Sequence, residues 1–409
     1  MSLHSNLKHK ETLDYNKILF VNIISILMGF AGGLLIYILS VFLKNIWNTE
    51  NIGWVFLIAN ILLLIILLNF HKITYSIDKI TIFQFLLIFK ISTIFALTLS
   101  LSAYIQTILL ALYIIFEALS WVLLKMILES YAIDKKTGRI YGFNAMITNI
   151  GFALAPIVAM HLLVSSGFYG VFYFSILLNS LIFLITFLNV NKSKIKEEID
   201  TTLQTDNVFY KLQFRDDIKK IFLVSLALEF FFAIMAIYTP IFLIDMGFSW
   251  KELGLIFTVM LIPFVTIQYP IGLLADKKLG EKELLLLSFG IIIITSILLY
   301  FYENTNITLI AIMIILLISR IGASAIDVLR LSYFYKRIDK TNLDMIAFFQ
   351  SARPIAYILA PALASLLLIF FPLKSVFILL TTISLLILYP IYTMDDNKPE
   401  LNQSPTLNS

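Results

Sequence analysis

Six ionisable side chains lie near the middle of long apolar stretches of this sequence, and their chemistry is that of ion pairs, proton transfer or the binding of charged groups. An ionised side chain at the centre of a helix in apolar surroundings costs about 2.5–3.5 kcal/mol, so such residues usually face a partner or a water-filled cavity. Three of the six are acids and three are bases, so they can neutralise one another. They are Lys90, Glu117, Glu229, Arg320, Asp327 and Arg353.

The apolar stretches that carry these charged residues are long enough to be membrane-spanning helices. Hydrophobic residues make up 60% of the 409 residues and charged residues only 14%, whereas about a quarter of the residues of a soluble domain are charged. A helix of about 20 apolar residues crosses a hydrocarbon core of about 30 Å. We therefore predict an all-α integral membrane protein with twelve transmembrane helices. The predicted spans are 17–44, 52–70, 80–100, 104–130, 141–163, 168–190, 218–244, 252–275, 283–301, 306–335, 344–371 and 373–393.

The distribution of basic residues predicts the orientation of the chain in the membrane. Most of the 30 Lys and Arg residues lie in segments on the same side as the N-terminus, while the opposite loops contain only Lys44, Lys251 and Lys374. An excess of Lys and Arg marks the cytoplasmic loops of membrane proteins. We therefore expect a multi-pass protein of the plasma (cell inner) membrane with both termini in the cytoplasm.

A polar segment near the middle of the chain divides the twelve spans into two groups of six. We predict an N-terminal six-helix half over 1–190, a cytoplasmic linker over 191–217, a C-terminal six-helix half over 218–394 and a cytoplasmic tail over 395–409. The linker is either a simple connection or a solvated helix on the membrane surface.

The two halves resemble each other when one is shifted by 205 residues. Residues 133–135 (IDK) then match 338–340, and residues 154–156 (LAP) match 359–361. Duplicated groups of helices with the same orientation are typical of transporters in which the substrate lies near the membrane midplane, between the halves. The sequence therefore favours transport.

The loop after the eighth span carries a motif, GLLADKKLGEK, that resembles the Gly-x-Leu-Ala-Asp-Arg-x-Gly-Arg signature of the major facilitator superfamily. Helix count, linker and termini extend the resemblance over the whole chain, and it implies alternating access with this loop as a cytoplasmic latch. The second glycine comes one residue late here, and Glu281 replaces a basic residue. The alternative is a tight loop without a latching role. The predicted gating loop contains Gly272, Asp276, Lys277 and Gly280. We expect Gly272 to permit a close approach of helices and Gly280 to adopt a positive φ in the turn.

The fifth span resembles a second family motif, the Gly-x8-Gly-x3-Gly-Pro-x2-Gly pattern of antiporters, with alanine at two glycine positions. Small residues at this spacing let helices pack closely, and the proline bends the helix. Because the same spacing recurs in the second half, we interpret the motif mainly as packing between the halves. The residues are Gly142, Gly151, Ala155, Pro156 and Ala159.

The family resemblance also assigns roles to the internal charges, because the first, fourth, seventh and tenth helices of the family line the central cavity. Glu117, Glu229, Arg320 and Asp327 lie on such helices. Neither glutamate has an acid or base within four residues of its own helix, so we favour them as proton carriers, with an ion pair as the alternative. Burial of a carboxyl in apolar surroundings favours its neutral form.

The expected roles of the three internal bases and of Asp327 follow from the groups with which they could pair. Arg320 and Arg353 would hold either an acidic group of the substrate or a carboxylate of the protein, because arginine stays charged. Asp327 lies three residues before Arg330, which predicts a structural pair. Lys90 is expected to pair with a residue of a neighbouring helix.

We conclude that the sequence predicts a secondary active transporter of a small molecule. The leading hypothesis is proton-coupled efflux, by antiport, of small amphipathic or drug-like compounds. Proton-coupled uptake of a polar nutrient such as a sugar or nucleoside is the first alternative, and export of an organic anion is the second. An enzyme is not expected, because there is no HExxH or GxSxG motif and no cysteine. We expect no cofactor, metal or nucleic acid, an ion gradient as the energy source, and a monomer in the lipid bilayer.

Overall fold

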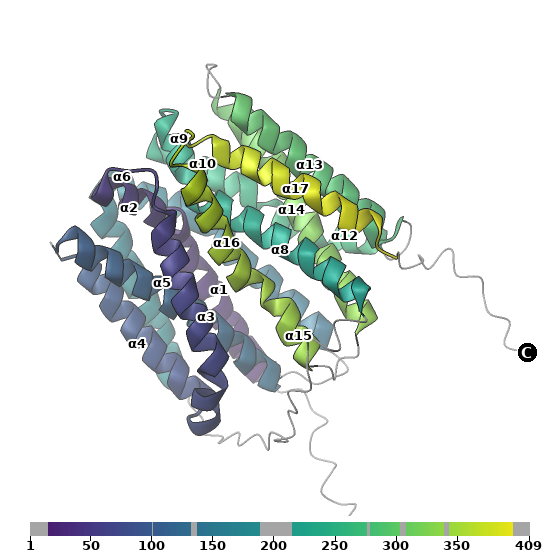
Figure 1. Ribbon diagram of the computed structural model, residues 1–409. Helices are drawn as coiled ribbons and strands as arrows, with labels where there is room; N and C mark the ends of the chain where they lie inside the picture. The colour runs from purple at the N-terminus through teal and green to yellow at the C-terminus, as the bar shows by residue number, and fades with distance from the viewer. Residues whose placement is uncertain are drawn as a thin grey trace, which may run out of the picture. The chain divides into compact units, whose positions relative to one another are not determined.

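The regular structure is entirely α-helical in the residues that the computed structural model describes, which are 15–99, 101–131, 137–188, 215–275, 279–302, 308–338 and 343–395. Every predicted span coincides with one or more helices, so the predicted all-α membrane fold is confirmed. The linker up to residue 214 and the tail from residue 396 lie outside the described residues. The helices are α1 (Tyr15–Ile36), α2 (Leu39–Trp47), α3 (Gly53–Ser76), α4 (Lys79–Leu97), α5 (Ala103–Tyr131), α6 (Thr137–Leu188), α8 (Asp216–Ile237), α9 (Thr239–Asp245), α10 (Trp250–Leu261), α11 (Pro263–Thr266), α12 (Gln268–Leu274), α13 (Glu281–Phe301), α14 (Leu309–Arg337), α15 (Leu343–Gln350), α16 (Ala352–Leu367) and α17 (Ser375–Tyr392) (Figure 1).

Length and composition suit these helices to a bilayer. Within the described part of the chain, nine continuous helical stretches are long and apolar enough to cross a membrane. One of them, Gly142–Leu188 in α6, contains two predicted spans, which meet where Gly167 adopts a φ of 64°. The two predicted spans that remain correspond to α3, with its apolar part Gly53–Leu67, and to α15 with α16.

Residue contacts divide the chain into two compact units. The first unit contains Met1–Leu35 and Leu62–Ile195, and the second contains Ile36–Ile61 and Lys196–Ser409. The short segment with α2 and the start of α3 therefore packs with the second unit. The domain boundaries proposed from the sequence stay a prediction.

The core of the first unit is formed by side chains of α1, α3, α4, α5 and α6. Val21 and Met28 of α1, Leu87 of α4, Leu123 of α5 and Ile182 of α6 are all buried in this one cluster. Lipid tails are as apolar as these side chains, so close van der Waals packing, more than exclusion of water, holds the helices together. Such packing fixes how far each helix is rotated about its axis.

Small residues let α1 and α6 approach each other closely. A Cβ atom on Gly151 of α6 would lie 2.4 Å from the carbonyl oxygen of Ile26, and one on Gly29 of α1 would lie 2.5 Å from that of Thr148. Both helices belong to the first unit. The expectation that this motif packs between the halves is therefore wrong at Gly151. The spacing of glycine and alanine in the sequence shows that one face of a helix carries small residues. It does not show which neighbouring helix packs against that face.

We expect Gly151→Ala to lower the thermal unfolding midpoint, because the new methyl group would collide with the backbone of α1. Overpacking of this kind costs about 1–3 kcal/mol. Gly142→Ala on the same helix is the matched control, since a Cβ atom there meets nothing within 4 Å. Fluorescence-monitored melting of the detergent-purified variants makes the comparison. Equal midpoints for the two variants would show that α1 and α6 can separate at no cost.

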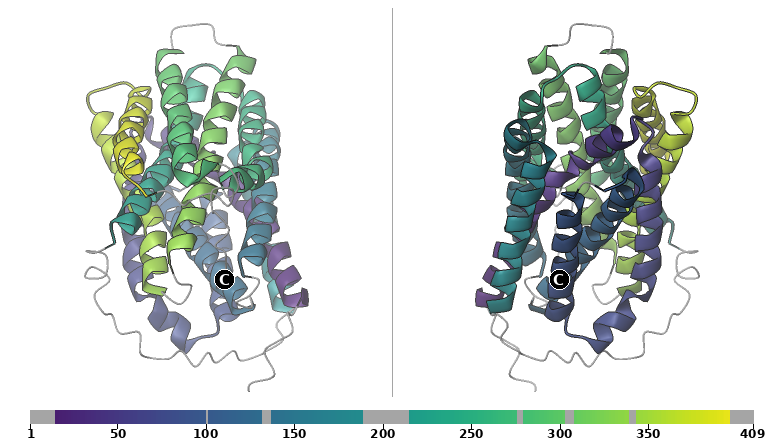
Figure 2. Two further views of the ribbon diagram at one scale, coloured as in Figure 1. Left: turned by 90° about the vertical axis from the view of Figure 1, so that its right-hand side faces the viewer. Right: turned by 90° about the vertical axis from the view of Figure 1, so that its left-hand side faces the viewer.

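The second unit places the helices that carry most of the internal charges side by side. α8 packs against α14, α16 and α17, and α13 lies beside α14 and α17 (Figure 2). α16 buries a face of small residues that includes Ala356, Ala360 and Ala364, so its backbone can come close to its neighbours. Residues Glu229, Asp327 and Arg353 are thereby brought within reach of one another.

Candidate functional site

In the first unit, Lys90 and Glu117 form an ion pair between α4 and α5. The distance from Lys90 Nζ to Glu117 Oε2 is 2.9 Å, and the lysine side chain is only 1% exposed. Trp121 Nε1 donates a hydrogen bond of 2.9 Å to Glu117 Oε1. On the side of α1, Gly32 leaves room for the carboxylate, since a Cβ atom there would lie 2.6 Å from Oε1. The partner expected for Lys90 is confirmed, and Glu117 is not an isolated acid.

In the second unit, Arg330 of α14 joins the two acids. Its guanidinium donates to Glu229 Oε1 of α8 at 2.9 Å and to Asp327 Oδ1 of its own helix at 2.8 Å. It also donates to Ser225 Oγ, and Gln268 Nε2 of α12 donates to Asp327 Oδ2 at 3.1 Å. The predicted pair of Asp327 and Arg330 is confirmed.

Sequence reasoning assigns Arg330 no more than this structural pairing, yet it is the centre of the network. The signal in the sequence is that Arg330 is one of five Lys and Arg residues that lie away from the ends of the predicted spans, at the place where Lys125 stands in the first half. Its second acid, Glu229, lies 101 positions away in the chain. No local spacing could reveal that contact.

Arg353, at the start of α16, completes the surroundings of Glu229. Its Nε lies 3.9 Å from Glu229 Oε2, and its guanidinium lies over the ring of Tyr357, 5.6 Å from the centroid. The Arg353 side chain is 60% exposed, whereas the Glu229 side chain is 9% exposed. Glu229 therefore lies between one tightly bound arginine and one loosely bound, accessible arginine.

Arg320, two turns before Asp327 on α14, has different surroundings. The residue is 3% exposed, and its Nε has no hydrogen-bond partner among the described residues. Its guanidinium lies over the rings of Phe231 and Phe232 of α8, at 5.1 and 5.8 Å from their centroids. The structure thus brings Glu229, Asp327 and Arg353 together around Arg330 and leaves Arg320 without an acid in the described part of the chain.

The predicted gating loop is described only in part, since Asp276 and Lys277 lie outside the described residues. Gly280 has a φ of 77°, as expected for a glycine that ends a tight turn, and α13 begins directly after it. Gly272 does not make the close helix contact that we expect from the sequence. A Cβ atom there would lie 3.8 Å from Val328, which is an ordinary contact that alanine could also make.

Glu281, the acidic residue in a basic position of the signature, links α13 to α14. It is completely buried, and its Oε1 accepts hydrogen bonds from Ser332 Oγ at 2.8 Å and from Lys336 Nζ at 2.6 Å. Just before α8, hydrogen bonds to Asp217 raise the pKa of Arg215, which keeps this guanidinium charged. The pair of Glu281 and Lys336 therefore holds the start of α13, directly after the loop, against the end of α14, while a latching role for the loop stays a prediction.

The family model of the Major Facilitator Superfamily matches residues 21–343 and 251–408. The chain belongs to the major facilitator superfamily. It is accordingly a multi-pass membrane protein and a secondary transporter of some small molecule, and its family is one of transporters and not of enzymes.

Solved structures of facilitator transporters show the same fold. The nucleoside transporter NupG is 15% identical, covers 94% of this chain and 100% of its own, and superposes with a TM-score of 0.73. A point mutant of NupG has the same TM-score at 14% identity, with 92% of this chain and 99% of that chain covered. A bacterial homologue of the iron transporter ferroportin, in an inward-facing state, is 13% identical with a TM-score of 0.69, and covers 93% of this chain and 99% of its own. The comparison with curated proteins found no match.

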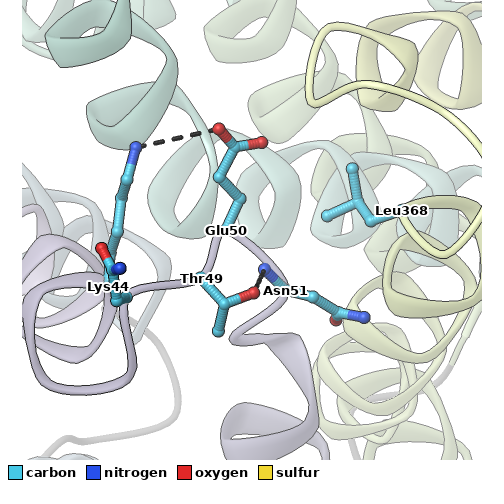
Figure 3. A pocket seen from close by; sticks show the side chains of 6 residues that line it. Lys44, Thr49, Glu50, Asn51 and Leu368 are labelled. Atoms are coloured by element: carbon cyan, nitrogen blue, oxygen red, sulfur yellow. Dashed lines mark hydrogen bonds and ion pairs between the residues drawn. The ribbon is translucent and has the colours of Figure 1, made fainter.

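The second unit of this facilitator also has a pocket of about 430 Å³ (Figure 3). Lys44 and Glu50 face each other across part of it at 3.8 Å, and Lys44 also pairs with Asp245 of α9. The base in this pocket is therefore already neutralised, and none of the six internal charges lines it. Among the described residues there is also no group of acids and histidines that could hold a metal ion. The lining residues are Lys44, Asn48, Thr49, Glu50, Asn51 and Leu368.

Proposed function

We propose that this transporter is proton-coupled and that Glu229 takes up and releases the proton. The observation that carries the proposal is the position of one buried carboxylate between two arginines, 2.9 Å from Arg330 and 3.9 Å from Arg353. A carboxylate in poorly hydrated surroundings changes its protonation state when its cationic partners move. Alternating access would provide that movement, because the three residues come from three different helices.

Protonation of Glu229 would change the charge that a substrate meets. Arg330 would keep its hydrogen bonds to Asp327, whereas Arg353 would lose the one acid that lies within ion-pair distance of it in the described part of the chain. The free guanidinium could then bind an electronegative group of the substrate. Proton and substrate would therefore strengthen each other's binding, since coupling between two ligands is reciprocal.

This coupling supports symport, in which proton and substrate move in the same direction, and an inward proton gradient would then drive uptake of a polar solute. Export by exchange needs a substrate that competes with the proton for a carboxylate. The two glutamates that interrupt apolar spans are each bound to a base, Glu117 to Lys90 and Glu229 to Arg330, so exchange has less support. The proposal includes a monomer in the plasma membrane with both termini cytoplasmic, as the basic residues predict.

The test is the pH change of a lightly buffered detergent solution of the purified protein as compounds are added. The panel contains nucleosides, sugars, amphipathic amines and aromatic carboxylates. We expect that a bound compound causes proton uptake by the wild type and none by Glu229→Gln, which cannot change its charge. Glu283→Gln is the matched control, because Glu283 is an exposed carboxylate of α13. It should take up protons as the wild type does.

Two results would contradict the proposal. Proton release on binding would mean exchange, and it would restore the efflux hypothesis. Proton uptake that persists in Glu229→Gln would place the proton on another group.

A further inference from the structure

We infer that Arg320 anchors a binding site for small aromatic monocarboxylates, an inference that deepens the proposed function and rests on it for the role of this site in transport. The residue is buried in α14, and its Nε lacks a hydrogen-bond partner. No acid of the described residues pairs with it. A buried donor that the protein leaves unsatisfied is available to a ligand.

The energetics of this arginine favour the binding of an anion. Arginine cannot become neutral by losing its proton at physiological pH. The cation–π contacts with Phe231 and Phe232 are favourable, but they leave the charge uncancelled and the Nε donor unused. A carboxylate would cancel the positive charge and would also accept a hydrogen bond from Nε, since it can accept two parallel hydrogen bonds from a guanidinium.

The charges of the surrounding network set the charge of the ligand. The network of Glu229, Asp327, Arg330 and Arg353, taken together with Arg320, contains three arginines and two acids, which leaves one positive charge in excess among these five residues. A monoanion neutralises that excess. A dianion such as phosphate would bring additional negative charge towards Asp327, which lies about 10 Å along the helix from Arg320, and towards Glu229.

The walls around Arg320 set the shape and polarity of the ligand. Phe231 and Phe232 cover the guanidinium, and Phe264 lies against Phe232 with a centroid distance of 5.8 Å. Tyr37 and Tyr357 are close enough to interact with the charge of Arg320. Aromatic walls favour a flat apolar body, because offset and edge-to-face ring contacts are favourable in addition to burial. A carboxylate on an aromatic ring combines both requirements.

The test is calorimetric titration of the purified protein in detergent with four probes of similar size: benzoate, benzamide, benzylamine and terephthalate. We expect measurable binding of benzoate, weaker binding of the dianion terephthalate, and none of the neutral or cationic probe. Arg320→Met should weaken benzoate binding by about tenfold or more, because a hydrogen-bonded charge pair is lost. The benzoate affinity of Arg320→Lys should lie between that of the wild type and that of Arg320→Met. Lys251→Met, which removes an exposed charge from α10, should bind benzoate as the wild type does.

A melting curve without ligand separates a ligand-binding arginine from a structural one. Arg320→Met should melt at a higher temperature than the wild type, since an apolar side chain replaces an unpaired buried charge and leaves no acid without its partner. A structural role predicts a lower midpoint. The inference is overturned if the wild type does not bind benzoate, if benzamide binds equally well, or if both Arg320 variants keep wild-type affinity.

Failure of this inference and failure of the proposed function are distinguishable. Benzoate binding that depends on Arg320 but takes up no proton would refute the role of Glu229 and support the site. Proton uptake through Glu229 with a nucleoside or sugar, in a protein that does not bind benzoate, would support the proton site and refute the carboxylate site.

Discussion

Glu117→Gln is expected to destabilise the protein strongly, by about 3–5 kcal/mol, because it leaves the buried ammonium group of Lys90 without its acid. The lysine side chain is 1% exposed, so water cannot replace the lost carboxylate. The loss should be visible as a lower melting temperature in detergent and as a smaller monodisperse fraction in size-exclusion chromatography.

The double variant Lys90→Met with Glu117→Gln provides the control. It removes the buried charge together with its partner, so most of the stability should return, and the two changes should be clearly non-additive. Lys90→Met alone should cost less than Glu117→Gln alone, because the Glu117 side chain is 17% exposed and keeps its hydrogen bond from Trp121. If Glu117→Gln melts like the wild type, the pair is not structural, and the hypothesis that Glu117 carries a proton regains support.

Arg330→Met is expected to abolish compound-dependent proton uptake and to lower the melting temperature. The change leaves two carboxylates, Glu229 and Asp327, without the guanidinium that binds both of them. Loss of one partner from a buried network of charges costs about 3–5 kcal/mol. Arg330→Lys should rescue only part of the stability, since one ammonium group cannot reproduce the fixed fork of the guanidinium.

A combined variant separates stability from coupling. Arg330→Met with Glu229→Gln and Asp327→Asn removes all three charges, so the melting temperature should recover while proton uptake stays absent. Lys219→Met is the matched control, because Lys219 forms an exposed ion pair with Asp216 at the start of α8. Exposed pairs contribute about 0–1 kcal/mol. Normal proton uptake in Arg330→Met would exclude this network from the coupling mechanism.

Local features of this protein could be predicted from the sequence. The helical spans follow from the length of apolar runs, which is a property of consecutive residues. The pairing of Asp327 with Arg330 follows from their spacing within one helix. The left-handed backbone of Gly280 follows from its place between two helices. Each of these depends on residues that are near in the chain.

Contacts between helices could not be predicted in the same way. Arg330 binds Glu229 across 101 positions, and Lys90 binds Glu117 across 27. The sequence suggests a proton carrier at each glutamate because neither has a charged neighbour on its own helix. Their partners lie on other helices, where spacing within one helix carries no information.

The order of the residues is therefore enough to predict a helical membrane protein with charges inside its spans, and its loop motif points to the family. Which charges meet, that Arg330 binds two acids, and that Arg320 has none among the described residues became visible only in the folded protein. The physical reason is that membrane helices are apolar on most faces, so no polar stripe shows which face points inward. The rotation of each helix is set by packing against its neighbours, as at Gly151 and Gly29, where backbones touch.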